Sequence, residues 1–174
     1  MKLILRILVV ILLLIGIVIA MGAALPKQHT ARVRTLIHAP ADSLFAAITD
    51  VENGTAWRSG LEKVEVLERE PLLWRETAEW GTITFVRDEA APPSRVVTRI
   101  ADESEGFGGT WTYEIAASPS QNGSTVTITE HGTVSNPLFR FLSKFVFGHH
   151  SALETYARDL ARRFGDTAEP ERVN

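Results

Sequence analysis

The sequence predicts an α+β domain in which an antiparallel sheet is covered by a long C-terminal helix, with an apolar helix preceding the domain. Three observations support this fold class: an uncharged run at residues 7–25, a series of strand-like runs without helices between them, and an apolar stripe within residues 137–164. The length of 174 residues and the hydrophobic content of 45% fit one globular domain with an additional apolar segment.

The uncharged run "ILVVILLLIGIVIAMGAAL" is nineteen residues long. At about 1.5 Å per residue a helix of this length spans roughly 28 Å, close to the ~30 Å hydrocarbon core of a bilayer. We therefore expect residues 1–26 to form a transmembrane anchor. A cleaved signal peptide is the alternative, because Lys2 and Arg6 form a basic start and "GAALPKQ" offers small residues for cleavage, although the apolar region of such peptides usually has about 7–15 residues. The run has no polar face, which disfavours a buried core helix.

Basic residues lie on both sides of the run, with Lys2 and Arg6 before it and Lys27, Arg32 and Arg34 after it. The short N-terminal tail favours an inside N-terminus, so the domain is expected on the outer, periplasmic or extracytoplasmic side, or secreted if the segment is cleaved. The net charge of −3 argues against a nucleic-acid partner. Because the chain has no cysteine, disulfides and cysteine-based sites are excluded.

After an expected linker at residues 27–30, alternating residues in "ARVRTLI" predict a first strand at 31–37. Pro40 and the apolar spacing that follows it predict two short helices joined at residues 50–53. Turn residues then separate further strands, so the sheet is expected to be an antiparallel meander of seven strands. The six later strands are expected at residues 63–68, 72–80, 82–87, 95–101, 110–116 and 124–134.

Apolar residues repeat at helical intervals near the C-terminus and predict one helix over residues 137–164. His149 occupies the single polar position of this stripe, so its side chain is expected to face the sheet, with His150 beside it. The domain is expected to span residues 31–166, followed by a polar tail at 167–174. The stripe consists of Leu138, Leu142, Phe145, Leu153, Tyr156, Leu160 and Phe164.

The segment "VRTLIHAPADSLFAAITDVENGTAWRSGLEKVEVL" and the closing helix resemble the START-like, helix-grip superfamily, also called SRPBCC or polyketide cyclase/dehydrase, over about residues 31–165. The resemblance implies a curved seven-stranded sheet wrapped around the C-terminal helix, with a cavity that binds hydrophobic or amphipathic small molecules. Members include lipid carriers, hormone receptors and aromatase/cyclases, so the fold alone does not define the function.

Strand parity and the helix stripe identify residues expected to face this cavity. Glu76, Glu130 and His149 are candidates for acid–base chemistry, because an apolar cavity can shift carboxylate and imidazole pKa values toward neutrality. The alternative is that each lies near a rim or pairs with a basic residue such as Arg58 or Arg87. The expected ligand-binding residues are Trp57, Trp74, Glu76, Phe85, Trp111, Tyr113, Ile128, Glu130, Phe145, His149 and Leu153.

Adjacent histidines on a helix point about 100° apart, so His149 and His150 are not expected to share a metal. Glu154 at i+4 from His150 completes only one pair of ligands, and neither a metal site nor a cofactor is expected. The preferred function is a membrane-tethered module that binds or transfers a lipid-like molecule. The alternatives are a cyclase- or dehydrase-type enzyme using the same cavity and a partner-binding domain without a ligand.

Overall fold

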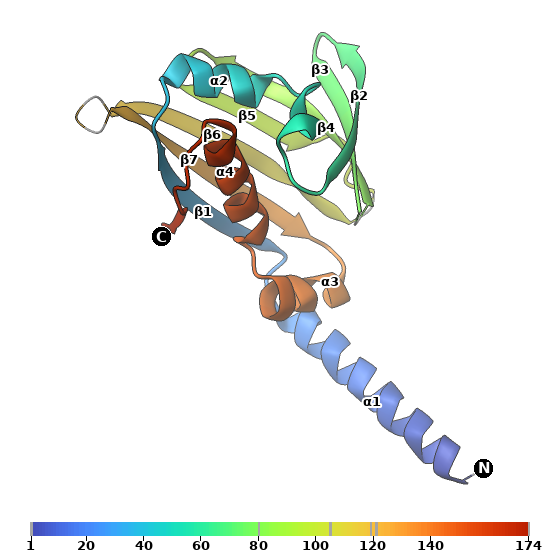
Figure 1. Cartoon of the computed structure of the whole chain (residues 1–174). Helices are drawn as coiled ribbons and strands as arrows, with labels where there is room; N and C mark the ends of the chain where they lie inside the picture. The colour runs from blue at the N-terminus through green and yellow to red at the C-terminus, as the bar shows by residue number, and fades with distance from the viewer. Residues whose placement is uncertain (1, 80, 105, 119, 121, 174) are drawn as a thin grey trace.

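The computed structural model describes residues 2–173 apart from residues 80, 105, 119 and 121. A curved antiparallel sheet carries two helices, α2 and α4, on its concave face. A long N-terminal helix, α1, projects away from this domain (Figure 1). The helical elements are α1 (Lys2–Ala24), α2 (Ala41–Thr49), the 3₁₀ turn η1 (Gly54–Ala56), α3 (Pro137–Leu142), the π turn η3 (Ser143–Phe147) and α4 (Ser151–Arg163).

The sheet has the order β2-β3-β4-β5-β6-β7-β1-β8, and its neighbouring strands are antiparallel. Strands β2 to β7 form the predicted antiparallel meander, whereas β1 pairs with β7 rather than with its neighbour in sequence, β2. The strands are β1 (Gln28–Ile37), β2 (Leu61–Arg69), β3 (Leu72–Ala78), β4 (Gly81–Ala91), β5 (Arg95–Ile100), β6 (Phe107–Ser118), β7 (Gly123–Val134) and β8 (Glu171–Arg172).

The predicted fold class is confirmed, with two changes at the ends of the domain. Strand β1 begins at Gln28, so residues 28–30 pair with β7 and the expected linker shrinks to residues 25–27. Strand β8 adds an eighth strand from the expected polar tail, because Val33 and Arg34 of β1 pair with Arg172 and Glu171. The end of the expected strand at 72–80 includes Trp80, which lies outside the described residues.

The prediction of a single helix over residues 137–164 is wrong, because the helical segment is divided at Gly148. The backbone of Gly148 has φ 75° and ψ 144°, a left-handed φ that favours glycine and interrupts helical hydrogen bonding. Helix α4 begins at Ser151, with His150 at the N-cap position but without a capping hydrogen bond from its side chain. The apolar spacing continued across this break, which is why periodicity alone did not detect it.

The core lies between α4, α2 and the concave face of the sheet. Leu153 and Leu160 of α4 and Ile128 of β7 are fully buried. Helix α4 is also fixed by Asp159, whose buried carboxylate accepts hydrogen bonds from the backbone N–H and hydroxyl of Ser59, each at 2.6 Å. This contact holds the segment after η1 against α4 and thereby positions the residues of the concave face.

Helix α1 is joined to the domain by direct contacts with α3 (Figure 1). The Arg140 guanidinium, on a largely buried side chain, donates hydrogen bonds to the carbonyl oxygens of Leu25 at 2.7 Å and Ala23 at 3.4 Å. These carbonyls have no helical donor at a C-terminus, where a cation is favourable. Gly22 approaches the Pro137 carbonyl so closely that a Cβ at position 22 would overlap it. We call this group of contacts the α1–α3 junction.

Candidate functional site

The centre of the concave face is filled by aromatic rings around Tyr156 of α4. Its ring lies 5.3 Å from those of Trp57 and Tyr113 and 6.0 Å from that of Trp111. Burial raises the pKa of Tyr156 to about 12 and also raises the pKa of Tyr113. Both phenols are therefore neutral at physiological pH, and the predicted aromatic residues form packed core at this point.

An ion pair between Arg58 and Glu76 packs against the aromatic cluster. The Arg58 guanidinium donates two hydrogen bonds to the Glu76 carboxylate, at 2.6 and 2.7 Å, and Trp74 Nε1 donates a third at 2.9 Å. The guanidinium also lies 5.2 Å from the Tyr156 ring centre. Burial opposes the charge of Arg58, but the hydrogen bonds and charge of Glu76 outweigh it and raise the Arg58 pKa. Glu76 is thus held as the partner of Arg58, the alternative to acid–base chemistry that the sequence left open.

Glu130 and His149 lie in a different part of the sheet. The His149 ring stacks on that of His29 of β1, with centroids 4.0 Å apart, and His29 Nε2 is 3.8 Å from Glu130 Oε1. Glu76 on β3 is four strands from Glu130 on β7, about 19 Å along the sheet at ~4.8 Å per strand. The two carboxylates therefore do not converge on one ligand. His149 does lie against the sheet, but in the turn between η3 and α4.

Phe145 does not line the concave face. Its side chain is 56% exposed, because the break at Gly148 separates η3 from the buried stripe of α4. By contrast, Leu153 and Ile128, which were expected to bind a ligand, are fully buried in the core, and Phe85 stacks on Trp74 with centroids 5.6 Å apart. Phe145 is thus placed outside the cavity that the helix stripe predicted.

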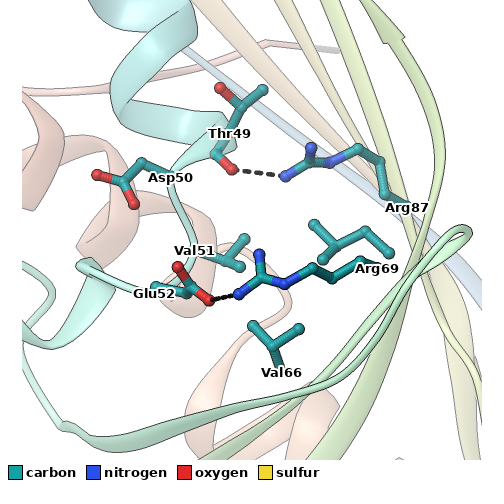
Figure 2. Close-up of a pocket in the computed structure, with 8 residues that line it drawn as sticks. Thr49, Asp50, Val51, Glu52, Val66, Arg69 and Arg87 are labelled. Carbon is teal, nitrogen blue, oxygen red and sulfur yellow. Dashed lines mark hydrogen bonds and ion pairs between the residues drawn. The ribbon is translucent and has the colours of Figure 1, made fainter.

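A pocket of about 270 Å³ opens between the end of α2 and the strands β2, β3 and β4 (Figure 2). Its apolar surface comes from Val51, Val66 and Leu72, and two arginines extend into it from the sheet. Arg69 pairs with Glu52 at 2.8 Å, and Asp50 accepts hydrogen bonds from the Asn53 amide. The full lining is Thr49, Asp50, Val51, Glu52, Val66, Arg69, Leu72 and Arg87.

Of the two arginines in this pocket, Arg87 has no carboxylate partner among the described residues. Its Nη2 donates to the Thr49 carbonyl oxygen at the end of α2, at 2.5 Å, while its Nε is buried and has no hydrogen-bond partner among the described residues. Burial lowers the pKa of Arg87. Figure 2 shows the Asp50 carboxylate directed away from this guanidinium. An anionic group in the pocket would satisfy both the charge and the unused donor.

Sequence reasoning did not include Arg87 among the residues facing a pocket, although strand parity could have identified it. Arg87 is two residues beyond Phe85 on β4 and shares its side of the strand. The pocket itself depends on how the loop after α2 closes over β2–β4, which local sequence does not define.

A second hollow, of about 820 Å³, lies on the other face of the sheet beneath residues 166–171. Threonines and charged residues line much of it, including Thr125, Thr127, Arg34 and Glu171. Among the described residues, no group of three or more histidine, cysteine, aspartate or glutamate side chains is arranged to hold a metal.

We predict that Glu76→Gln destabilises the fold by about 3 kcal/mol, because removing one partner of a buried ion pair leaves the other charge uncompensated. Chemical denaturation of the purified chain measures this difference. Glu65→Gln is the matched control, since Glu65 pairs with Lys63 on the exposed surface, where solvent screening leaves such a pair with little effect on stability. Equal, small effects of both substitutions would contradict a structural role for the Arg58–Glu76 pair.

The His149 pKa is lowered, first by burial and then by the positive charge of His29. The folded state therefore binds the His149 proton less readily than the unfolded state, so this residue's contribution to stability is present above pH 6.5 and is lost as the pH falls below it. We expect an NMR titration to place the His149 midpoint below 6.5. His29→Gln should move that midpoint upward, and a midpoint unaffected by this change would contradict the stacked arrangement.

Comparisons with known proteins agree with this architecture. Residues 37–152 match the family model described as "Polyketide cyclase / dehydrase and lipid transport". No curated protein sequence matches the chain. Among solved structures, the Zhui aromatase/cyclase from Streptomyces sp. R1128 has a TM-score of 0.65 and 15% identity, covering 79% of this chain and 94% of its own.

Two further solved structures have the same fold. A START superfamily protein from Mycobacterium smegmatis has a TM-score of 0.62 and 16% identity, covering 80% of this chain and 98% of its own. A norcoclaurine synthase point mutant from Thalictrum flavum has a TM-score of 0.63 and 8% identity, covering 79% of this chain and 94% of its own. At these identities the likeness concerns the fold. The family model covers most of the domain and the fold agrees with it, so this chain belongs to the polyketide cyclase/dehydrase and lipid transport family.

Proposed function

We propose that this protein is a membrane-tethered module that binds a hydrophobic or amphipathic molecule through an anionic group at Arg87. The family and the START-like fold support a ligand-binding module in general. The observation that carries the finer proposal is the half-buried Arg87 side chain beside apolar residues of the pocket. Its Nε is buried without a hydrogen-bond partner, and its charge has no carboxylate partner, among the described residues. A carboxylate or phosphate matches the planar donors of arginine.

The size of the pocket limits the ligand. About 270 Å³ is at the lower end of small-molecule pockets, which typically have ~300–1,000 Å³. The pocket would therefore hold an anionic head group and a short apolar stem against Val51, Val66 and Leu72. The centre of the concave face offers less space for a ligand, because the aromatic cluster and the Arg58–Glu76 pair occupy it.

The tether is α1, with the N-terminus inside and the domain on the outer side. This helix is long and apolar enough to cross a membrane, and its apolar side chains are exposed. The α1–α3 junction supports an uncleaved anchor rather than a removable signal peptide. Cleavage after α1 would remove the Ala23 acceptor and the helix end that Arg140 caps, leaving a buried guanidinium with fewer partners.

The enzyme alternative has weaker support. Acid–base chemistry needs a free carboxylate or imidazole beside the reacting atoms. Glu76 is bonded to Arg58, whereas Glu130 and His149 belong to a cluster around His29 on the opposite part of the sheet. None of these three residues lines the pocket that contains Arg87.

Binding of a fluorescent fatty acid to the detergent-solubilised full chain tests the ligand proposal. We expect Arg87→Met to weaken binding by roughly 10–100-fold, since a hydrogen bond to a charged group contributes ~1.5–3 kcal/mol. Arg95→Met is the control, because Arg95 is an exposed residue of the same sheet that pairs with Glu89 and Glu114. The methyl ester of the same probe should bind the two variants equally. Unchanged fatty-acid affinity in Arg87→Met would refute the anion site.

The tether can be tested by intact-mass measurement of the protein extracted from membranes. We expect a mass that includes residues 1–26, because the α1–α3 junction requires the helix. A mature chain that begins after residue 24 would establish a cleaved signal peptide instead.

A further inference from the structure

The segment after α3 exposes an unusual concentration of apolar side chains. We define the apolar ledge as Leu138 and Phe139 of α3 with Phe145, Val146 and Phe147 of η3. Their exposed fractions are 43%, 39%, 56%, 61% and 66%, respectively. Outside α1, the described residues include only one other large apolar side chain exposed to this degree, Leu67 on β2. The ledge therefore concentrates exposed apolar side chains on two consecutive elements, and clustered exposed apolar residues mark docking sites.

The position of the ledge identifies what covers it. Helix α3 begins at Pro137, which contacts Gly22 in the last turns of α1, and Arg140 caps the end of the same helix. Figure 1 shows α3 and the turn after it beside the C-terminal end of α1, displaced from the layer formed by α4 and the sheet. The ledge thus lies next to the end of the proposed membrane span.

The depth of the C-terminal end of α1 in the bilayer follows from the position of Gly22 within the uncharged run. Gly22 is three residues before Leu25, the last residue of the uncharged run, which corresponds to about 4.5 Å along a helix. An element in contact with Gly22 is therefore at the boundary between hydrocarbon and head groups. Amphipathic segments at this boundary bury their apolar side to ~5–10 Å, and the exposed Lys144 within the ledge segment would remain near lipid phosphates.

We propose that the apolar ledge inserts into the outer-leaflet interface of the bilayer that α1 spans, as a second membrane contact of the domain. This inference rests on the tether in the proposed function. The occupant is lipid rather than a second copy of the chain, because the ledge is fixed at membrane depth by the α1–α3 junction. Phe107 at the start of β6 packs on Phe139 with centroids 5.0 Å apart, so the ledge also contacts the end of an interior strand of the sheet.

Single cysteines provide the test, because the chain has none of its own. The full chain is reconstituted in phosphatidylcholine/phosphatidylglycerol vesicles with an environment-sensitive fluorophore on Phe147→Cys, Ile15→Cys or Leu67→Cys. Ile15 lies within α1 and reports on the tether, whereas Leu67 is an exposed apolar residue on β2, at the edge of the sheet opposite β1 and β8. Quenching is compared for lipids that carry a doxyl group near the head group or near the chain end.

We expect the label at position 147 to be quenched at least about two-fold, more strongly by the shallow doxyl than by the deep one, as for an interfacial segment. The label at position 15 should prefer the deep quencher, and the label at position 67 should respond to neither. Quenching at position 15 without quenching at position 147 overturns the ledge while the tether stands. A blue-shifted but unquenched label at position 147 identifies a protein contact, such as a second copy, and also overturns it. Absence of quenching at position 15 refutes the tether itself and the inference with it.

Discussion

The backbone conformation of Gly148 determines which apolar residues of the C-terminal region become core. A continuous helix would place Phe145 and Leu153 on one stripe, two turns apart. The left-handed φ at Gly148 separates them, so that Leu153 is fully buried against the sheet while Phe145 is exposed. One glycine therefore divides the segment into a part that closes the domain and a part that begins with α3, the helix in contact with α1.

The polar groups of the concave face differ in how completely they are hydrogen-bonded. Glu76 has its oxygens bonded to Arg58 and Trp74, and such a satisfied group stabilises a defined packing around Tyr156. Arg87, by comparison, has only the Thr49 carbonyl as a partner among the described residues. The centre also has a buried donor without a partner among the described residues, Trp57 Nε1. Of the two, only Arg87 adds a positive charge that no carboxylate of the described residues neutralises, so the edge near α2 is better suited to an anionic ligand than the centre.

Much of the fold could be predicted from the sequence, because strand alternation and helical spacing are local patterns. The seven main strands, the helix after β1 and the buried stripe of α4 all appear near the expected residues. Pairing of Glu76 with a basic residue such as Arg58 was one alternative that the sequence offered, but the choice between the alternatives and the separation of Glu76 from Glu130 could not be predicted, since both depend on strand order and curvature. Gly148 was visible as a weak helix former, but the apolar spacing on either side of it fitted an uninterrupted helix equally well. Arg87 was accessible to parity reasoning, whereas its lack of a carboxylate partner was not.

The α1–α3 junction also limits how far the domain can travel. Only residues 25–27 separate α1 from β1, and three residues reach at most about 10 Å when fully extended. Arg140 holds even this short connection in place. With α1 anchored in a bilayer as proposed, a domain mounted in this way could not carry a ligand across an aqueous gap between two membranes. Any protein or membrane that exchanged ligand with it would have to come to the surface of that bilayer.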